Sequence, residues 1–201
     1  MAVDVGHFHA EPGVLSASGI PEFEFNLRLA LEVKNDLEKS GLHVRLIGEK
    51  GKHVYLNRRT REAAGADLFV SIHHDSMRES LLPTRRDALA GFSLFVSRQN
   101  PHPEKSLACA SAIGAELRGA GFTPSRYHAD PVLGENRPFA DEVNGVHYYD
   151  NLAVGKTASM PAVLVEAGVI VNRHEEAKMH DPAVRGRIAQ AIARGVRRCL
   201  P

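Results

Sequence analysis

Short apolar runs alternate along the chain with longer segments in which apolar residues recur every three or four positions. The short runs predict β-strands, and the periodic segments predict amphipathic α-helices. Strands are predicted at residues 2–5, 43–47, 67–72, 91–97 and 162–165. Helices are predicted at residues 23–39, 56–64, 105–117 and from 182 to about 199.

This alternation of strands and helices predicts an α/β fold, with a mostly parallel, twisted sheet covered by helices on both faces. A length of 201 residues, without an internal repeat or a linker, predicts a single domain over residues 1–201. Residues 77–90 and 122–150 have the least regular patterns. We expect the second segment to be a long surface excursion, and ordered loops of that length are often functional.

Composition narrows the range of functions. The chain has 25 Lys and Arg against 24 Asp and Glu, and this near-balance argues against a nucleic-acid partner. Because no apolar run approaches about 18 residues, we expect no transmembrane segment. The first ten residues lack the pattern of a signal peptide, so we expect none in this chain. The 11 histidines indicate metal chemistry, and the sequence leaves open whether Cys109 and Cys199 pair.

Polar side chains follow three of the predicted strands. His7 comes after the first strand, His73, His74 and Asp75 follow the third, and Glu166 follows the last. Because ligands bind at the carboxyl ends of strands in open α/β sheets, we expect these side chains to share one crevice. Imidazoles and carboxylates are ligands that zinc favours. Neighbouring residues in a strand point to opposite faces, so only one of His73 and His74 readily enters a given site.

Glu166 interrupts the apolar stretch PAVLVEAGVIV. Since burying a carboxylate without a partner is costly, two interpretations are open: an ion pair with Arg or Lys, or a place beside a metal or as a general base. Each histidine is likewise either a metal ligand or a hydrogen-bonded core residue. The residues alone do not distinguish Glu22 from Glu24 as a further ligand.

Four blocks of sequence occur in a recognisable order. They are VDVGH at 3–7, EFEFNLRLALEV at 22–33, ADLFVSIHHDS at 66–76 and MPAVLVEAGVIVN at 160–172. Together they resemble the zinc-dependent N-acetylmuramoyl-L-alanine amidases of the amidase-3 family, which cleave bacterial peptidoglycan. The resemblance extends from residue 3 to about residue 196, with 77–90 and 122–150 poorly matched.

The resemblance implies a ligand set and a reaction. His7, Glu22 and His73 match the residues that hold one Zn²⁺ per chain, and Glu166 matches the catalytic carboxylate that activates water. The implied reaction is hydrolysis of the amide bond between N-acetylmuramic acid and L-alanine in peptidoglycan or a muropeptide. That substrate implies a periplasmic or cell-wall location. The sequence does not indicate whether an activator protein is a partner.

Some positions depart from the family pattern. His74 and Asp75 replace small or amide residues, and Lys156 stands where an arginine is common. All three are candidates for a position behind the metal ligands or at the rim of the crevice. Asp75 is a candidate to hold the outer nitrogen of an imidazole, as carboxylates behind metal ligands do. Further candidates for the crevice rim come from the excursion, where the alternative is a solvated loop; they are His128, Glu135, Asn136 and Arg137.

Two other functions use the same residue types. One is a different zinc hydrolase, such as a carboxypeptidase that removes one terminal residue from stem peptides. The other is a non-catalytic wall-binding module on an amidase scaffold. A complete ligand set together with Glu166 favours an enzyme, and the absence of a G-x-S-x-G sequence gives no support to a serine hydrolase.

Overall fold

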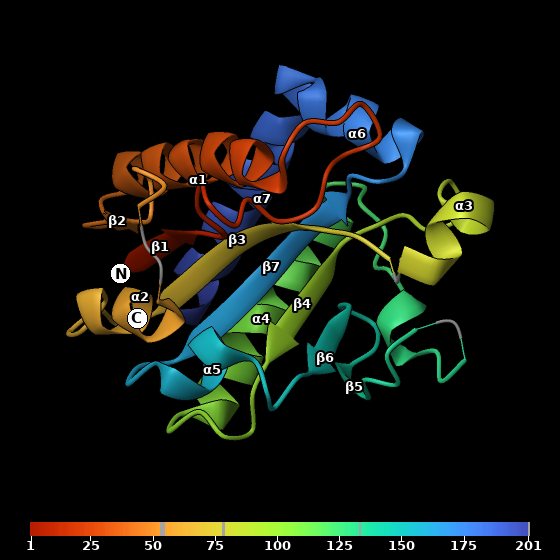
Figure 1. Ribbon diagram of the computed structural model, residues 1–201. Coiled ribbons are helices and arrows are strands. Elements are labelled where there is room, and N and C mark those ends of the chain that lie inside the picture. The colour runs from red at the N-terminus through yellow and green to blue at the C-terminus, as the bar shows by residue number, and fades with distance from the viewer. Residues whose placement is uncertain (53–54, 78, 133, 201) are drawn as a thin grey trace.

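The computed structural model describes residues 1–52, 55–77, 79–132 and 134–200. Within these ranges, seven strands form one sheet in the order β2-β1-β3-β7-β4-β6-β5 (Figure 1). Strands β1, β2, β3 and β7 are mutually parallel, whereas β4 is antiparallel to β7 and β5 is antiparallel to β6. The strands are β1 (Ala2–Val5), β2 (Arg45–Ile47), β3 (Phe69–Asp75), β4 (Ser93–Val96), β5 (Phe139–Asp141), β6 (Val146–Tyr148) and β7 (Ala162–Val169).

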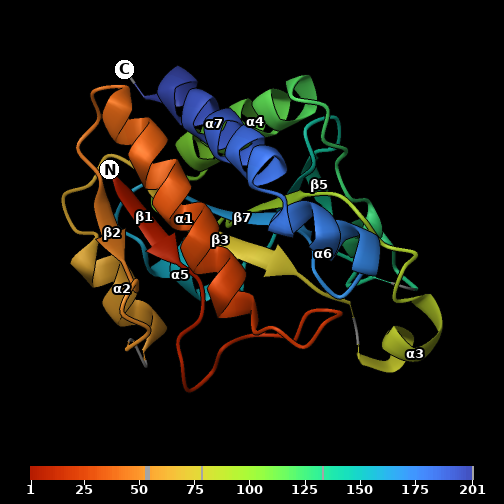
Figure 2. The ribbon, with the colours of Figure 1, turned by 90° about the horizontal axis from the view of Figure 1, so that it is seen from above.

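Helices cover both faces of this sheet, as the sequence predicts. The long helices α1 (Glu22–Lys39), α4 (Pro103–Gly119) and α7 (Pro182–Cys199) pack together on one face (Figure 2). The short helices α2 (Leu56–Glu62) and α5 (Ala153–Thr157) pack against the other face. The remaining helices are α3 (Leu82–Arg85) and α6 (Arg173–His180), and single 3₁₀ turns occur at Glu79–Leu81 and Tyr127–Ala129.

The central strands are buried on both faces. In β1, Val3 and Val5 join the core under the long helices, whereas Ala2 joins the core under α2 and α5. In β3, Val70 belongs to the core under the long helices, and Phe69 belongs to the core under α2 and α5. This alternation explains why these strands are continuously apolar in sequence, because each residue has a helix-covered face to contact.

The short helices α2 and α5 cover only part of their face of the sheet. The site occupies the part of that face that they leave uncovered. Figure 1 shows α2 and α5 near the starts of β3 and β7, away from the carboxyl ends of those strands. His73 in β3 lies opposite Glu166 in β7 in the parallel register. Both residues therefore point to the same face, beyond the short helices.

Two strands are longer than predicted, and one predicted loop contains strands. Strand β3 continues through Asp75, and β7 continues through Glu166 to Val169, so these polar residues lie within strands rather than after them. The excursion at 122–150 is only partly a surface loop, because it contributes β5 and β6 to the sheet. Strands of three residues are too short to show a periodic pattern. Arg78 and Leu133 of the two irregular segments, and Pro201, lie outside the described residues.

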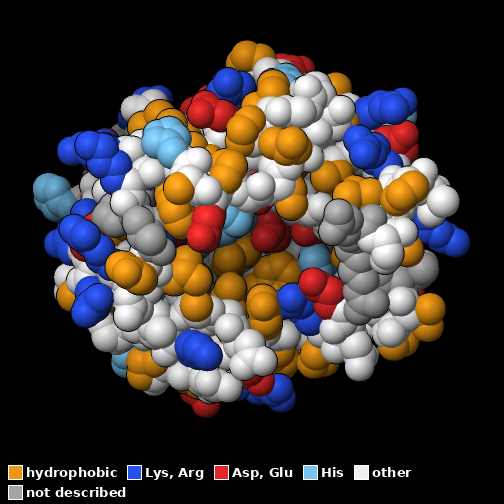
Figure 3. All heavy atoms as spheres, in the orientation of Figure 1, with side chains coloured by type: hydrophobic (Ala, Val, Ile, Leu, Met, Phe, Trp, Pro, Cys, Tyr) orange, Lys and Arg blue, Asp and Glu red, His pale blue; other side chains and the backbone are white. Residues whose placement is uncertain are grey.

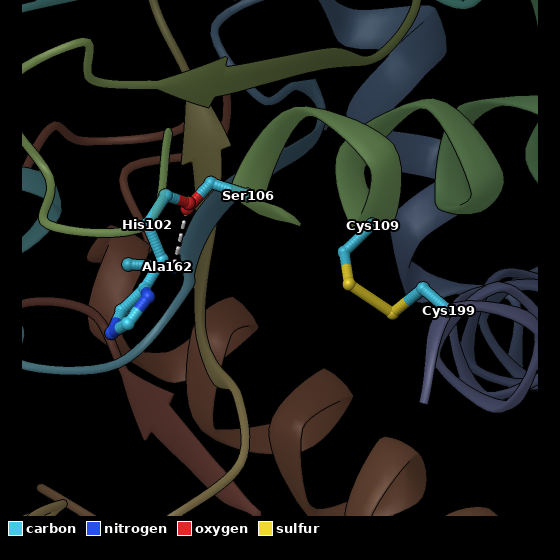
Figure 4. The surroundings of a disulfide bond; sticks show 5 residues. All are labelled: His102, Ser106, Cys109, Ala162 and Cys199. Atoms are coloured by element: carbon cyan, nitrogen blue, oxygen red, sulfur yellow. Dashed lines mark hydrogen bonds between the residues drawn. A yellow bond between two sulfur atoms is a disulfide. The ribbon is translucent and has the colours of Figure 1, made fainter. Parts of the chain in front are cut away.

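A disulfide joins Cys109 of α4 to Cys199 at the end of α7, with 5.0 Å between their Cα atoms (Figure 4). The sequence left this pairing open. One turn before Cys109, the Ser106 hydroxyl accepts a 3.0 Å hydrogen bond from the Ala162 backbone N–H. Helix α4 is therefore attached both to the closing helix and to the start of β7. Among the described residues, no helix has the length and hydropathy needed to cross a membrane.

Candidate metal centre and active-site cavity

Three side chains from three elements converge at the carboxyl edge of the sheet. His7 follows β1, Glu22 is the first residue of α1, and His73 lies in β3. The two oxygens of Glu22 lie 3.0 Å from His7 Nε2 and 3.1 Å from His73 Nδ1. One potential ligand atom from each residue lies within 4.8 Å of the others. Helix α1 thus begins where its first carboxylate meets both imidazoles.

This donor set fits Zn²⁺. Two imidazoles and a carboxylate are ligands that zinc favours, and three protein ligands are typical of catalytic zinc sites, which keep a fourth position open. Burial alone would raise the pKa of Glu22, but hydrogen bonds from His7 and His73 lower that pKa well below its usual value. Glu22 is therefore an anion that can bind a cation.

Two glycines make the close approach of these ligands possible. A Cβ atom on Gly6 would lie 2.4 Å from the imidazole of His73. A Cβ atom on Gly13, where φ is +80°, would lie 2.3 Å from the Glu22 carboxylate. Any larger residue at either position displaces a candidate ligand, so the loops around the centre require glycine.

A buried arginine holds the turn that carries His7. His7 has a φ of +66°, which is uncommon for a residue other than glycine. Arg59 in α2 is 1% exposed, donates a 2.7 Å hydrogen bond to Asp4, and also donates to the backbone carbonyls of Val5 and His7. Nothing in the local sequence around Arg59 indicates this role. The available signal was Asp4, because a carboxylate in an apolar strand needs a partner.

Asn26 and His74 support Glu22 from the opposite side. Asn26 donates hydrogen bonds to the Glu22 carboxylate at 3.0 Å and to the Gly6 carbonyl at 3.2 Å. The His74 backbone N–H also donates to Glu22, and its imidazole lies 2.8 Å from the Asn26 side-chain oxygen. Burial lowers the pKa of His74 to about 3, so this imidazole is neutral. It does not line the active-site cavity, but it helps to fix Glu22.

A cavity of about 250 Å³ opens beside the three candidate ligands. Figure 3 shows it as a hollow in which histidine and acidic side chains meet an apolar floor. Strands β3 and β7 contribute His73, Asp75 and Glu166 to its polar lining, and the loop after β1 contributes His7. The excursion contributes His128, Glu135, Arg137 and Tyr149. Asn136 and Lys156 are exposed and do not line it, although the sequence placed both as candidates for its rim.

Glu166 lies in this cavity without a counter-ion. Its Oε2 atom is buried and has no hydrogen-bond partner among the described residues, and no Lys or Arg of those residues forms an ion pair with it. Burial, followed by the charges of Asp75 and Glu22, raises the pKa of Glu166 well above its usual value. Of the two interpretations from sequence, the buried ion pair therefore has no support.

The excursion forms a charged network along one wall. The ring nitrogens of His128 lie 2.6 Å from Asp75 and 2.9 Å from Glu135, and Arg137 Nε lies 2.5 Å from Glu135. Burial alone would lower the pKa of His128, but the charge of Asp75 and hydrogen bonds to both carboxylates raise it to about 9. Asp75 thus holds an imidazole, but that of His128 rather than that of a candidate ligand.

Comparison with known proteins gives consistent matches. The family model described as N-acetylmuramoyl-L-alanine amidase matches residues 1–198. The amidase AmiC of Neisseria meningitidis is 28% identical over 98% of this chain and 52% of its own length, so the chain spans about half of that relative.

Solved structures show the same fold. The catalytic domain of CwlV, an N-acetylmuramoyl-L-alanine amidase from Bacillus (Paenibacillus) polymyxa var. colistinus, is 29% identical with a TM-score of 0.76, covering 98% of this chain and 95% of that one. Ami1 from Mycobacterium smegmatis is 22% identical with a TM-score of 0.80, covering 98% and 94% of the two chains.

Proposed function

The chain belongs to the N-acetylmuramoyl-L-alanine amidase family, and on that premise we propose that it uses one Zn²⁺ to hydrolyse the amide bond between N-acetylmuramic acid and L-alanine. The substrate is peptidoglycan or a muropeptide. The observation that carries the proposal is the convergence of His7, Glu22 and His73 beside Glu166, at the edge of one cavity.

The three converging residues hold the metal. His7 and His73 offer imidazole nitrogens, and Glu22 offers a carboxylate whose position is fixed by Asn26. When bound there, Zn²⁺ supplies a Lewis acid that polarises the scissile carbonyl and makes water a stronger nucleophile near neutral pH. Because Asn26 and the His74 backbone orient the Glu22 carboxylate, the ligands are arranged before the metal binds.

Glu166 moves the protons. As water attacks the amide carbonyl, the Glu166 carboxylate accepts a proton from that water as a general base. It then donates the proton to the leaving amine of L-alanine, so that one carboxyl group serves both halves of the reaction. Its buried position raises the pKa of Glu166, which makes the carboxylate a stronger base and favours its acceptance of the proton from water. These two proton transfers require no covalent intermediate between enzyme and substrate. The products are the free muramic acid carboxylate and the intact stem peptide.

Replacement of Glu166 tests this assignment. We expect Glu166→Gln to lower the rate of muropeptide cleavage by about 10²–10⁴-fold, while bound zinc stays near one per chain. Glu38→Gln is the matched control, because Glu38 lies on the exposed side of α1 in an ion pair with Lys34. Cleavage is measured by mass spectrometry of digested muropeptides, and zinc by elemental analysis.

The digestion products also separate the other functions. An amidase releases a complete stem peptide with L-alanine at its amino terminus. Release of a single terminal residue would instead indicate a carboxypeptidase, and tight binding without cleavage by the zinc-loaded wild type would indicate a wall-binding module. A Glu166→Gln variant that cleaves at the wild-type rate would contradict the role of Glu166.

The disulfide supports a location outside the cytoplasm. Disulfides persist in oxidising compartments and are rare in the cytosol, and Cys109 and Cys199 are joined in the fold. We therefore place the working protein in a periplasm or at a cell wall, where its substrate lies. Alkylation of thiols in fractionated cells, with and without reductant, tests this placement, and free thiols in the native protein would contradict it.

A further inference from the structure

The excursion at 122–150 brings one guanidinium group into the active-site cavity. The Arg137 backbone N–H donates a 2.8 Å hydrogen bond to the His128 carbonyl, which fixes the position of Arg137 relative to His128. The guanidinium carbon lies 3.3 Å from the centre of the Tyr149 ring and 5.4 Å from that of Phe95. Stacking on Tyr149 fixes the plane of the guanidinium, so its free edge has a defined direction.

Two buried donors of this group, Arg137 Nε and Nη1, make no hydrogen bond to any described residue. Nε lies within ion-pair distance of Glu135, so Nη1 is the one of the two that lacks any partner among those residues. Arg137 Nε faces Glu135, whose carboxylate also contacts His128, and the second nitrogen of His128 contacts Asp75. Along this wall two cations, His128 and Arg137, therefore face two carboxylates, Asp75 and Glu135. Arg137 lines the cavity, and its Nη1 donor is left without a partner among the described residues.

The chemistry of that donor selects a carboxylate. An arginine guanidinium forms charge-assisted hydrogen bonds with carboxylates, and a planar group held against an aromatic ring loses little freedom when it does so. The apolar side chains of Phe95 and Leu152 line the same cavity and limit competition from water. A neutral sugar or amide group would satisfy the donor without using its charge.

The lining of the cavity places this carboxylate close to the scissile bond. Arg137 shares the cavity with His7, His73 and Glu166, so a group that binds its guanidinium there lies near the metal centre. The only carboxyl group of N-acetylmuramic acid is consumed in the scissile amide. A carboxylate this close must therefore belong to the peptide. Resting on the proposed function, we propose that Arg137 binds the carboxylate of the residue that follows L-alanine in the stem peptide.

A pair of synthetic substrates tests this subsite. The first is N-acetylmuramoyl-L-alanyl-D-isoglutamyl-L-lysine, and the second is its D-isoglutaminyl analogue, which differs by one carboxamide in place of one carboxylate. We expect the wild type to favour the carboxylate in kcat/KM by about 10–100-fold, the range of a charge-assisted hydrogen bond. In Arg137→Gln we expect this ratio to fall to about one, and in Arg137→Lys to an intermediate value, because lysine keeps the charge without the planar fork.

Arg126→Gln is the matched control. Arg126 belongs to the same excursion but is exposed, pairs with Glu142 and does not line the cavity. We expect this variant to keep the wild-type ratio. A wild type without a preference for the carboxylate overturns the proposal. So does an Arg137→Gln variant that loses activity equally on both substrates, because a purely structural role for Arg137 gives that result.

A binding measurement separates this proposal from the function on which it rests. If the zinc-loaded wild type cleaves neither substrate, the proposed function fails. The subsite is then judged by calorimetric titration of the tripeptides L-alanyl-D-isoglutamyl-L-lysine and L-alanyl-D-isoglutaminyl-L-lysine into wild type and Arg137→Gln. We expect a preference for the carboxylate of at least tenfold in the wild type alone. Equal affinities in the wild type refute the subsite.

Discussion

Gly6→Ala would displace one imidazole of the metal centre without altering any ligand. The added Cβ atom would lie 2.4 Å from the His73 ring, whereas ordinary van der Waals contact begins at 3.4 Å. Gly6 does not have a positive φ, so alanine strains the ring contact rather than the backbone. The His73 side chain is the part that can move, and it has to move by about 1 Å.

A displacement of this size is large for a metal ligand. Zinc–ligand distances are held within about 0.2 Å, so the expected shift is several times the tolerance. Disturbing the residues that orient a zinc ligand typically costs about 10–100-fold in metal affinity. We therefore expect Gly6→Ala to weaken zinc binding at least tenfold, which corresponds to about 1.4 kcal/mol.

Competition with a chromogenic chelator measures zinc affinity, and thermal unfolding with and without zinc measures the linked stabilisation. Gly186→Ala in α7 is the control, because a Cβ atom at Gly186 meets nothing within 4 Å. We expect that variant to bind zinc normally and to gain up to about 1 kcal/mol of stability, since glycine is unfavourable inside helices. Wild-type zinc affinity in Gly6→Ala would refute the role of His73 as a ligand.

Three further results follow from the structure. The pKa of His128 is raised to about 9 from a usual 6.5, so its ion pairs contribute up to about 3 kcal/mol below pH 6.5, and this contribution is lost as pH rises through 9. Urea unfolding should show the gap between wild type and His128→Gln narrowing from pH 6 to pH 10, and a constant gap would contradict the charged state of His128. Asn26→Ala should lower the free energy of unfolding by about 1–3 kcal/mol, because two buried acceptors lose their donor. It should also weaken zinc binding, measured by chelator competition. Unchanged zinc affinity would mean that Asn26 does not orient the Glu22 carboxylate. The disulfide joins residues separated by 90 positions, so Cys109→Ser should lower the free energy of unfolding in urea by about 2–5 kcal/mol. Added reductant should destabilise the wild type, but it should not destabilise a variant that lacks both Cys109 and Cys199.

The position of the site at the carboxyl edge of the sheet follows from the sequence. The lengths of the apolar runs mark β1, β3 and β7, and parallel strands bring the polar residues at their ends together. His7, Glu166 and the pair His73 and His74 could therefore be placed at this edge from pattern alone. The choice of Glu22 over Glu24 could not, because both lie in the first turn of α1, and the structure shows that Glu22 faces the imidazoles. Only the resemblance indicated Glu22 beforehand.

Other parts of the site depend on contacts that leave no local pattern. Arg59 reaches Asp4 across 55 positions, and neither the helix nor the strand alone indicates the pairing. Arg137 and Tyr149 stack because an irregular segment folds back on the sheet, and irregular segments lack the periodicity from which side-chain direction is inferred. The opposite orientations of His73 and His74 were predictable from strand geometry. Which of the two enters the cavity was not.

The order of the strands separates substitutions in the interior of the sheet from substitutions and insertions at its margin. The candidate ligands and Glu166 belong to the interior of the sheet and to the helix packed on it, where a substitution disturbs neighbours on both sides. The wall with Arg137 and Tyr149 belongs to the periphery, near β6 and β5 at the margin of the sheet. Insertions and exchanges are tolerated there at little cost to the rest of the fold. Descendants of this chain can therefore acquire new substrate preferences by remodelling the margin, while the reaction chemistry in the interior is inherited unchanged.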